Sequence, residues 1–231
     1  MNIAILSDIH GNIFALRKCI EYIEKIKIDS IIFCGDYISD IPRSHEVISC
    51  LKELSSKYKC YFIKGNRENY VIDYLKSNKK NWTIDNRNAP MLCTLNELTE
   101  EDIAFIEKLP DSIGINIEGH PAIYVRHKRI ENSNEFCAEF AVLNVDNNQS
   151  NLEFINIKYD MGEVIKSIKD SELSNTRIKW DQILIKTIEC GVDYSELYIK
   201  KVLENAKKIG ISDIDDIPMN IWDEAEIELF K

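Results

Sequence analysis

Three short polar stretches, each directly after an apolar run, contain side chains able to bind metal ions. Asp8 and His10 follow the run NIAIL, and Asp36 follows SIIFCG. Asn66 and Arg67 follow the third run, CYFIKG. Carboxylate, imidazole and amide groups together suit divalent cations such as Mn, Fe, Zn, Ni or Mg. These residues therefore predict a metal site, provided that the fold brings the three stretches together.

The apolar runs alternate with amphipathic segments, which predicts strands alternating with helices. Such a chain forms a parallel sheet with right-handed crossovers. Ligands of these sheets bind at the carboxyl ends of the strands, so the polar stretches should meet at one edge. We expect strands at 2–7, 30–35 and 60–65, and helices at 13–27, near 45–57 and from about residue 67.

The remainder of the chain changes character several times. Residues 78–98 are polar and irregular, which predicts a surface loop, and a short helix follows at 99–109. From Met161 onward the pattern is helical. We expect residues 1–160 to form one domain and residues 161–231 a helical C-terminal extension packed on it. Further strands are predicted around a turn at 118–121 within 113–127, and at 136–145 and 152–160.

Each polar motif also has an ordinary structural interpretation when it is taken alone. Asp8 and His10 could lie in an exposed loop, and Gly-Asp or Gly-Asn after a strand is a common turn. All three motifs in order, each after a strand, favour the metal site.

The series Asp-x-His, Gly-Asp-x-x-Asp and Gly-Asn-x-Glu resembles the calcineurin-like metallophosphoesterases, in particular their small bacterial phosphodiesterase branch. The resemblance covers nearly the whole chain. It implies an α/β fold in which a β-sandwich is flanked by helices (α/β/β/α). It also implies two divalent metal ions, with manganese expected first and Fe, Zn, Ni or Mg as alternatives. Asp8 and His10 would hold one metal, Asp36 would bridge both, and Asn66 would bind the second.

A further ligand of this family is a histidine at the end of a later strand. His127 fits that position, although the family has His-Gly there and this chain has His127–Lys128. The alternative for His127 is a solvent-facing residue at a strand end.

The Gly-His-x-His motif of the family has no counterpart in this chain. Gly119–His120–Pro121 lacks the second histidine, and we interpret His120 as a turn residue. The resemblance therefore implies an internal shortening between about residues 130 and 136, with one ligand fewer for each metal. Water, Glu131 or Asp146 could fill the open positions.

The resemblance implies a metal-dependent phosphoesterase that cleaves phosphodiesters or phosphomonoesters with hydroxide activated by two metals. Asn66 and Arg67 are the predicted catalytic residues. Arg67 stands where many relatives have a histidine acid, and a guanidinium group does not donate a proton at neutral pH. It can still bind phosphate oxygens. The alternatives are that Arg67 only pairs with a nearby acid, and that the protein is a degenerate family member with a binding or regulatory role.

The composition limits the partners that we expect. A formal net charge of -10 argues against non-specific nucleic-acid binding, whereas a small phosphate ester could be held by metal ions. Seven cysteines without a C-x-x-C motif indicate reduced thiols and a cytoplasmic protein. We expect no signal peptide and no membrane span. An exposed sheet edge beside the shortened segment leaves a homodimer open.

Overall fold

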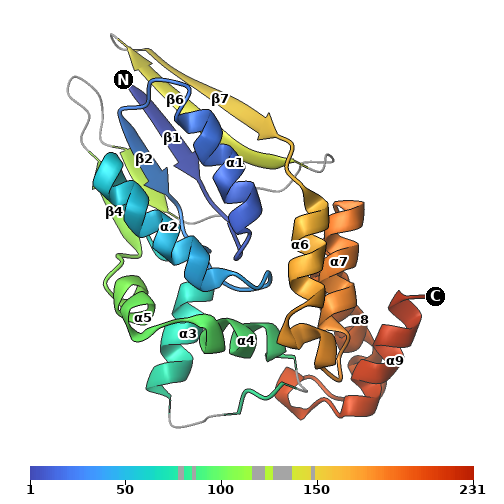
Figure 1. Cartoon of the computed structure of the whole chain (residues 1–231). Helices are drawn as coiled ribbons and strands as arrows, with labels where there is room; N and C mark the ends of the chain where they lie inside the picture. Colours follow the sequence, from blue (N-terminus) through green and yellow to red (C-terminus); the bar gives the residue numbers. More distant parts are fainter. Residues whose placement is uncertain (78–80, 85–86, 116–122, 127–136, 147–148) are drawn as a thin grey trace.

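A computed structural model describes residues 1–231 except 78–80, 85–86, 116–122, 127–136 and 147–148. Its main sheet has five strands in the order β3-β2-β1-β6-β7 (Figure 1). The first three strands run parallel, as predicted, and an antiparallel pair extends the sheet beyond β1. The strands are β1 (Asn2–Leu6), β2 (Ser30–Phe33), β3 (Lys59–Phe62), β6 (Ala138–Asp146) and β7 (Gln149–Ile157).

In the N-terminal part, α1 (Ile13–Ile23) and α2 (Ser44–Lys57) cover one face of this sheet, and further helices follow beyond the ends of its strands (Figure 1). The first begins at a cap in which the Asn12 side chain accepts a hydrogen bond from the Ala15 N–H, at 3.0 Å. It ends at Ile23, before the predicted Lys27. The Lys27 carbonyl and the Asp29 carboxylate instead accept hydrogen bonds from Asn2 at the start of β1. The helices are α1 (Ile13–Ile23), α2 (Ser44–Lys57), α3 (Asn66–Lys76), α4 (Ala89–Glu97) and α5 (Glu100–Glu107).

The prediction of a surface loop at 78–98 is wrong for the second half of this segment. Residues 89–97 form α4, with Pro90 in its first turn, where a missing backbone N–H has no cost. Met91 and Cys93 are buried and pack into the two main hydrophobic clusters. The sequence did not predict this helix, because polar residues precede Ala89 and the short apolar face of the helix is recognised only from its packing.

The opposite face of the main sheet packs against a second, two-stranded sheet of β4 (Ser112–Ile115) and β5 (Ile123–Arg126). Ile3, Ile32 and Ile115 are among the buried residues between the two layers. The mixed α/β fold with flanking helices and C-terminal helices is therefore confirmed. The predicted turn at 118–121 and the expected shortening between 130 and 136 lie outside the described residues.

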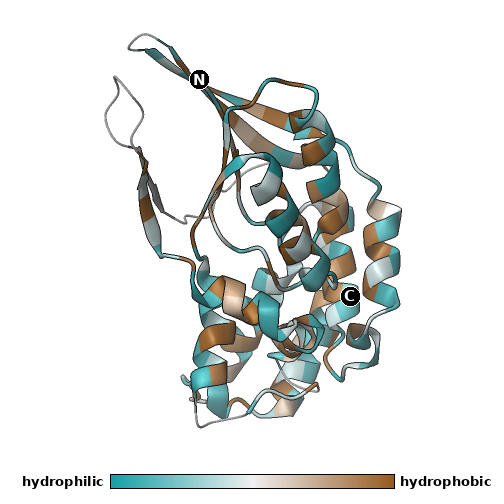
Figure 2. Cartoon of the chain, turned by 60° about the vertical axis from the view of Figure 1, so that its left-hand side comes forward, coloured by the Kyte–Doolittle hydropathy of each residue, from teal (hydrophilic) through white to brown (hydrophobic). Residues whose placement is uncertain are grey.

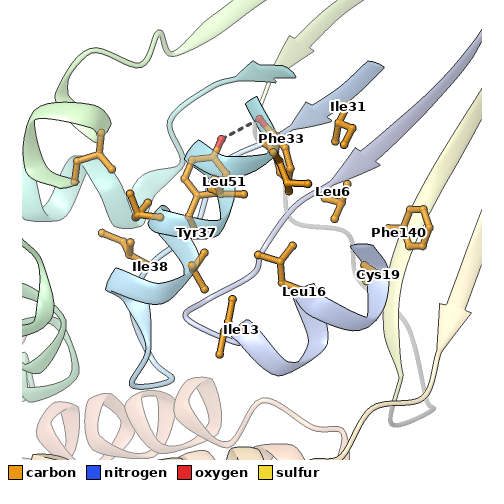
Figure 3. Close-up of a cluster of buried hydrophobic side chains, with 14 of the residues drawn as sticks. Leu6, Ile13, Leu16, Cys19, Ile31, Phe33, Tyr37, Ile38, Leu51 and Phe140 are labelled. Carbon is orange, nitrogen blue, oxygen red and sulfur yellow. Dashed lines mark hydrogen bonds between the residues drawn. The ribbon is translucent and has the colours of Figure 1, made fainter. Parts of the chain in front are cut away.

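Tyr37 joins the ends of β2 and β3 inside the larger core. The side chain is fully buried, and its hydroxyl lies 2.9 Å from the Phe33 carbonyl oxygen (Figure 3). The same hydroxyl lies 2.5 Å from the Ile63 carbonyl oxygen and accepts a hydrogen bond from the Gly35 N–H. Burial raises the pKa of Tyr37 well above its usual value, so the hydroxyl keeps its proton. The loop after β2 is thus anchored in the core.

The C-terminal helices form a bundle with its own buried cluster, which includes Trp180, Tyr198 and Trp222. In Figure 1, β7 leads directly into the first of these helices, and Figure 2 shows hydrophobic and hydrophilic residues alternating along them. The cluster also contains Ile41 and Ala89 of the N-terminal part, so the two parts pack together. The helices are α6 (Met161–Lys169), α7 (Trp180–Cys190), α8 (Tyr194–Lys208) and α9 (Met219–Leu229).

In the part of the chain that the structure describes, no helix is both long and apolar enough to cross a bilayer.

The buried carboxylate of Asp102 holds α2 and α5 together. It lies 2.7 Å from Lys52 Nζ and 2.6 Å from His45 Nδ1, and it accepts a hydrogen bond from the Thr99 N–H. Burial alone would raise the pKa of Asp102, but its partners Lys52, His45 and Thr99 hold this pKa below the usual range.

We predict that Asp102→Asn lowers the free energy of unfolding by about 2 kcal/mol at pH 7. Because the pKa of Asp102 is lower in the folded than in the unfolded state, its contribution is present above about pH 4 and is lost as the pH falls below that. Urea unfolding at pH 7 and pH 3 checks this. The variant and the wild type should differ less at pH 3. An equal difference at both pH values would contradict the prediction, and Asp111→Asn, at an exposed carboxylate, is the control.

Candidate metal centre

The loops after β1 and β2 hold unusual backbone conformations. Five residues other than glycine in these loops have a left-handed backbone. This conformation costs about 1 kcal/mol or more for a residue that has a Cβ atom. Backbone hydrogen bonds between the loops offset this cost: the His10 N–H donates to the Asp36 carbonyl and the Gly11 N–H to the Tyr37 carbonyl, both at 2.9 Å. Strain of this kind concentrates at functional sites. The residues are Asp8, His10, Asp36, Ser39 and Asp40, with φ between 49° and 85°.

Two glycines allow the loops after β2 and β3 to touch. A Cβ atom at Gly35, where φ is 95°, would lie 2.4 Å from the Gly65 nitrogen. A Cβ atom at Gly65 would lie 2.1 Å from Asp36 Oδ1. Any side chain at either position would therefore push the loops apart and displace Asp36.

The predicted ligands Asp8, His10 and Asp36 come together at the carboxyl ends of β1 and β2. One ligand atom of each lies within 4.8 Å of the others. Nε2 of His10 is 3.7 Å from Asp8 Oδ1 and 3.9 Å from Asp36 Oδ2. Two carboxylates and one imidazole that converge in this way suit a divalent cation of intermediate hardness. The donor set fits one metal ion.

Asp40, which was not among the predicted site residues, faces the other side of the imidazole. Its Oδ2 lies 3.1 Å from His10 Nδ1 and 3.1 Å from the Arg67 guanidinium. A carboxylate at Nδ1 favours the tautomer with hydrogen there, which leaves the Nε2 lone pair available for a metal. Burial would raise the pKa of Asp40, but Arg67 and His10 hold it below its usual range.

The same carboxylates affect the charge of His10. Burial would lower the pKa of His10, but the carboxylates of Asp40 and Asp8 outweigh burial and raise it to about 10. In the metal-free protein the imidazole is therefore protonated at neutral pH. A metal ion that binds at Nε2 must displace this proton.

Glu68 connects the loop after β2 with the loop after β3. Its side chain is fully buried, and its carboxylate accepts hydrogen bonds from the N–H groups of Gly65 at 2.8 Å, Asp36 at 3.0 Å and Tyr37 at 2.8 Å. Burial raises the pKa of Glu68, and these hydrogen bonds oppose the rise. The carboxylate holds the backbone of Asp36 in its strained conformation.

Asn66 and Arg67 begin α3 beside this loop. The Arg67 N–H donates to Asp36 Oδ1 at 2.9 Å, while its guanidinium contacts Asp40, so Arg67 does pair with a nearby acid. Asn66 is exposed, and its metal-binding and catalytic roles stay predictions. His127 lies outside the described residues, so its role also stays a prediction.

Asp40 and Glu68 lie near the site, and the sequence assigned neither of them a metal-binding or catalytic role. Both belong to the motifs Gly-Asp-x-x-Asp and Gly-Asn-x-Glu. Glu68 also stands at the third position of α3, where a carboxylate commonly accepts hydrogen bonds from the N-cap. This position in the helix could have indicated the role of Glu68 from the sequence. The contact of Asp40 with His10 could not be read in the same way, because it depends on the positive φ of both residues.

The sheet edge and its carboxylate–imidazole cluster define an α/β metal-binding protein. The model of the calcineurin-like phosphoesterase family matches residues 1–157, and the chain belongs to this family.

Known proteins resemble the chain at low sequence identity. An uncharacterized protein of Methanocaldococcus jannaschii, MJ0912, is 27% identical over 124 residues, which are 53% of this chain and 47% of that protein. The chain therefore spans about half the length of this relative. A metallophosphoesterase of Sphaerobacter thermophilus has a TM-score of 0.59 at 16% identity, covering 83% of this chain and 100% of that one. The hypothetical protein PH1004 of Pyrococcus horikoshii has a TM-score of 0.64 at 19% identity, covering 81% and 97%. These structures share the fold.

We predict that Glu68→Gln lowers the free energy of unfolding by about 2 kcal/mol or more. The amide has one acceptor oxygen for three backbone donors, and hydrogen bonds to a charged group contribute about 1.5–3 kcal/mol each. Manganese affinity should fall as well, because Asp36 loses its support. Urea unfolding and calorimetric titration with Mn²⁺ measure the two effects.

The matched control is Glu97→Gln, since this carboxylate accepts a hydrogen bond from the Ser44 N–H away from the cluster. Unchanged manganese affinity in Glu68→Gln would show that Glu68 does not support the site.

Proposed function

We propose that the protein is a metal-dependent phosphoesterase that hydrolyses small phosphate esters with two divalent ions, manganese being the first choice. The observation that carries this proposal is the convergence of Asp8, His10 and Asp36 at the carboxyl ends of two parallel strands. Membership of the calcineurin-like phosphoesterase family supports it.

Asp8, His10 and Asp36 would hold the first ion. The second would be held by Asp36, Asn66 and His127, of which Asp36 lies in the cluster and Asn66 begins the neighbouring helix. When bound, such ions lower the pKa of a water molecule and neutralise charge on the phosphate.

The protein's own groups would bind the phosphate and keep the ligands in place. Asp40 holds the His10 ring in the orientation that presents Nε2 to the cluster. Arg67 lies at the edge of the cluster, where its guanidinium can bind phosphate oxygens with two hydrogen bonds. Because a guanidinium group is not an acid at neutral pH, the chemistry favours leaving groups that need no proton donor, such as aryl alcohols.

Asp36→Asn should reduce manganese-dependent hydrolysis of bis-p-nitrophenyl phosphate more than about 100-fold, since the amide removes the negative charge that the metal needs. The assay uses metal-stripped protein with and without added Mn²⁺, and circular dichroism verifies the fold of the variant. Manganese-dependent turnover that is equal in wild type and variant would contradict this site. If the folded wild type shows no turnover, the enzyme hypothesis fails and a binding or regulatory role remains.

Arg67→His should weaken the dependence of the rate on the leaving group. Histidine can donate a proton near neutral pH, so it should help the poorer leaving group more. The measurement is the ratio of kcat/KM for p-nitrophenyl phosphate to that for phenyl phosphate, and this ratio should fall at least about threefold. Arg67→Lys, which keeps the charge without providing an acid, is the control. A ratio that is the same in all three proteins would refute the assigned role of Arg67.

A further inference from the structure

A groove of about 1190 Å³ opens beside the metal cluster, between α3 and α8. Asp40 and Arg67, which adjoin the candidate ligands, form one end of it. The wall across from α3 belongs to the C-terminal helices, which lie outside the segment that the family model matches. Pockets for drug-sized ligands measure about 300–1,000 Å³, so this groove has room for much more than a phosphate group.

One side of α3 leads away from the cluster along this groove. Arg67, Tyr70 and Tyr74 all line the groove, and their spacing of three and four residues puts them on one helix face. At 1.5 Å per residue, Tyr74 is about 10 Å farther along the helix axis than Arg67. A sugar with an attached ring could bridge this distance from a phosphate bound at Arg67, whereas a short alkyl alcohol could not.

The surface at the far end of this path is aromatic. Tyr74 stacks on Trp82, with ring centroids 3.9 Å apart and planes inclined by 8°. Tyr70 is 50% exposed, although it is a large aromatic residue. Flat rings of this kind stack with any nucleobase, because every base presents a π-face.

The opposite wall provides apolar contact and charged side chains of both signs, since Glu196 and Glu204 line it beside two lysines. Lys200, Leu203 and Lys207 line the groove at helical spacing, while Tyr198 and Val202 on another face of α8 are buried in the C-terminal core. Leu203 is 40% exposed. Among the described residues, neither lysine is in an ion pair. These groups suit a ligand with a flat ring and polar groups that form hydrogen bonds.

Acidic groups complete the lining. Asp73 and Glu196 contribute to the groove beside the aromatic and basic residues. Carboxylates accept hydrogen bonds from sugar hydroxyls, which an aryl or alkyl alcohol without a sugar does not offer. The combination of rings, cations and carboxylates therefore favours a nucleoside over a simple aryl group.

We propose that this groove binds the nucleoside part of a phosphate ester while the phosphate lies at the metal cluster. The α8 helix would form the outer wall of the substrate site. The inference rests on the proposed phosphoesterase function and adds the class of substrate.

The test compares thymidine 5′-p-nitrophenyl phosphate with methyl p-nitrophenyl phosphate, two diesters that share their leaving group. The readout is the ratio of their kcat/KM values with Mn²⁺. Tyr70→Ala and Leu203→Glu should each lower this ratio about tenfold, because the first removes a stacking ring and the second replaces an apolar contact to the nucleoside with a charged group. Leu197→Glu is the matched control, because Leu197 is on the same helix and 41% exposed but does not line the groove. It should leave the ratio unchanged. A ratio that does not fall in Tyr70→Ala and Leu203→Glu would overturn the proposal.

If the wild type hydrolyses neither ester, the proposed function fails. A binding measurement then tests separately whether the groove binds a nucleoside. Thymidine 5′-monophosphate should quench tryptophan fluorescence saturably, because Trp82 lines the groove. Quenching that persists in Leu197→Glu and is lost in Tyr70→Ala would support nucleoside binding. Absence of saturable quenching in the wild type, or equal quenching in all three proteins, would overturn it.

Discussion

The candidate metal centre depends on the hydrogen bonds that the buried carboxylate of Glu68 accepts. This carboxylate accepts hydrogen bonds from three backbone N–H groups, two in the loop after β2 and one in the loop after β3. Asp36 needs this support, since its backbone is left-handed and its side chain is almost fully buried. A buried negative charge with three backbone partners is more stable than an unpaired one, so the loops and the carboxylate stabilise each other.

Further contacts connect this hydrogen-bonded loop with the core on one side and with the groove on the other. Tyr37, directly after Asp36, is bonded to the end of β3, while the first turn of α3 contacts Asp36 through the Arg67 N–H. The same helix then carries Tyr70 and Tyr74 into the groove. The loop that positions a candidate ligand therefore also sets the direction of the proposed substrate path.

The sequence predicted the parts of the fold that follow from local patterns. Short apolar runs before Asp8, Asp36 and Asn66 are typical of buried parallel strands, and the sheet edge at their ends follows from topology. The contact between Asp40 and His10 could not be predicted in this way, since it depends on left-handed backbone at both residues. Helix α4 was missed because its burial depends on two clusters, one of them formed by the C-terminal helices, which are distant in the sequence. For the same reason, no local pattern indicated a groove with α8 as its wall.

The central claim is that Asp8, His10 and Asp36 form a metal-binding centre. The most direct measurement is anomalous diffraction at the manganese absorption edge from crystals grown with Mn²⁺. The account predicts an anomalous peak within about 2.0–2.3 Å of His10 Nε2 and of a carboxylate oxygen from both Asp8 and Asp36. Crystals grown with saturating Mn²⁺ that show no anomalous peak among these three side chains would contradict it.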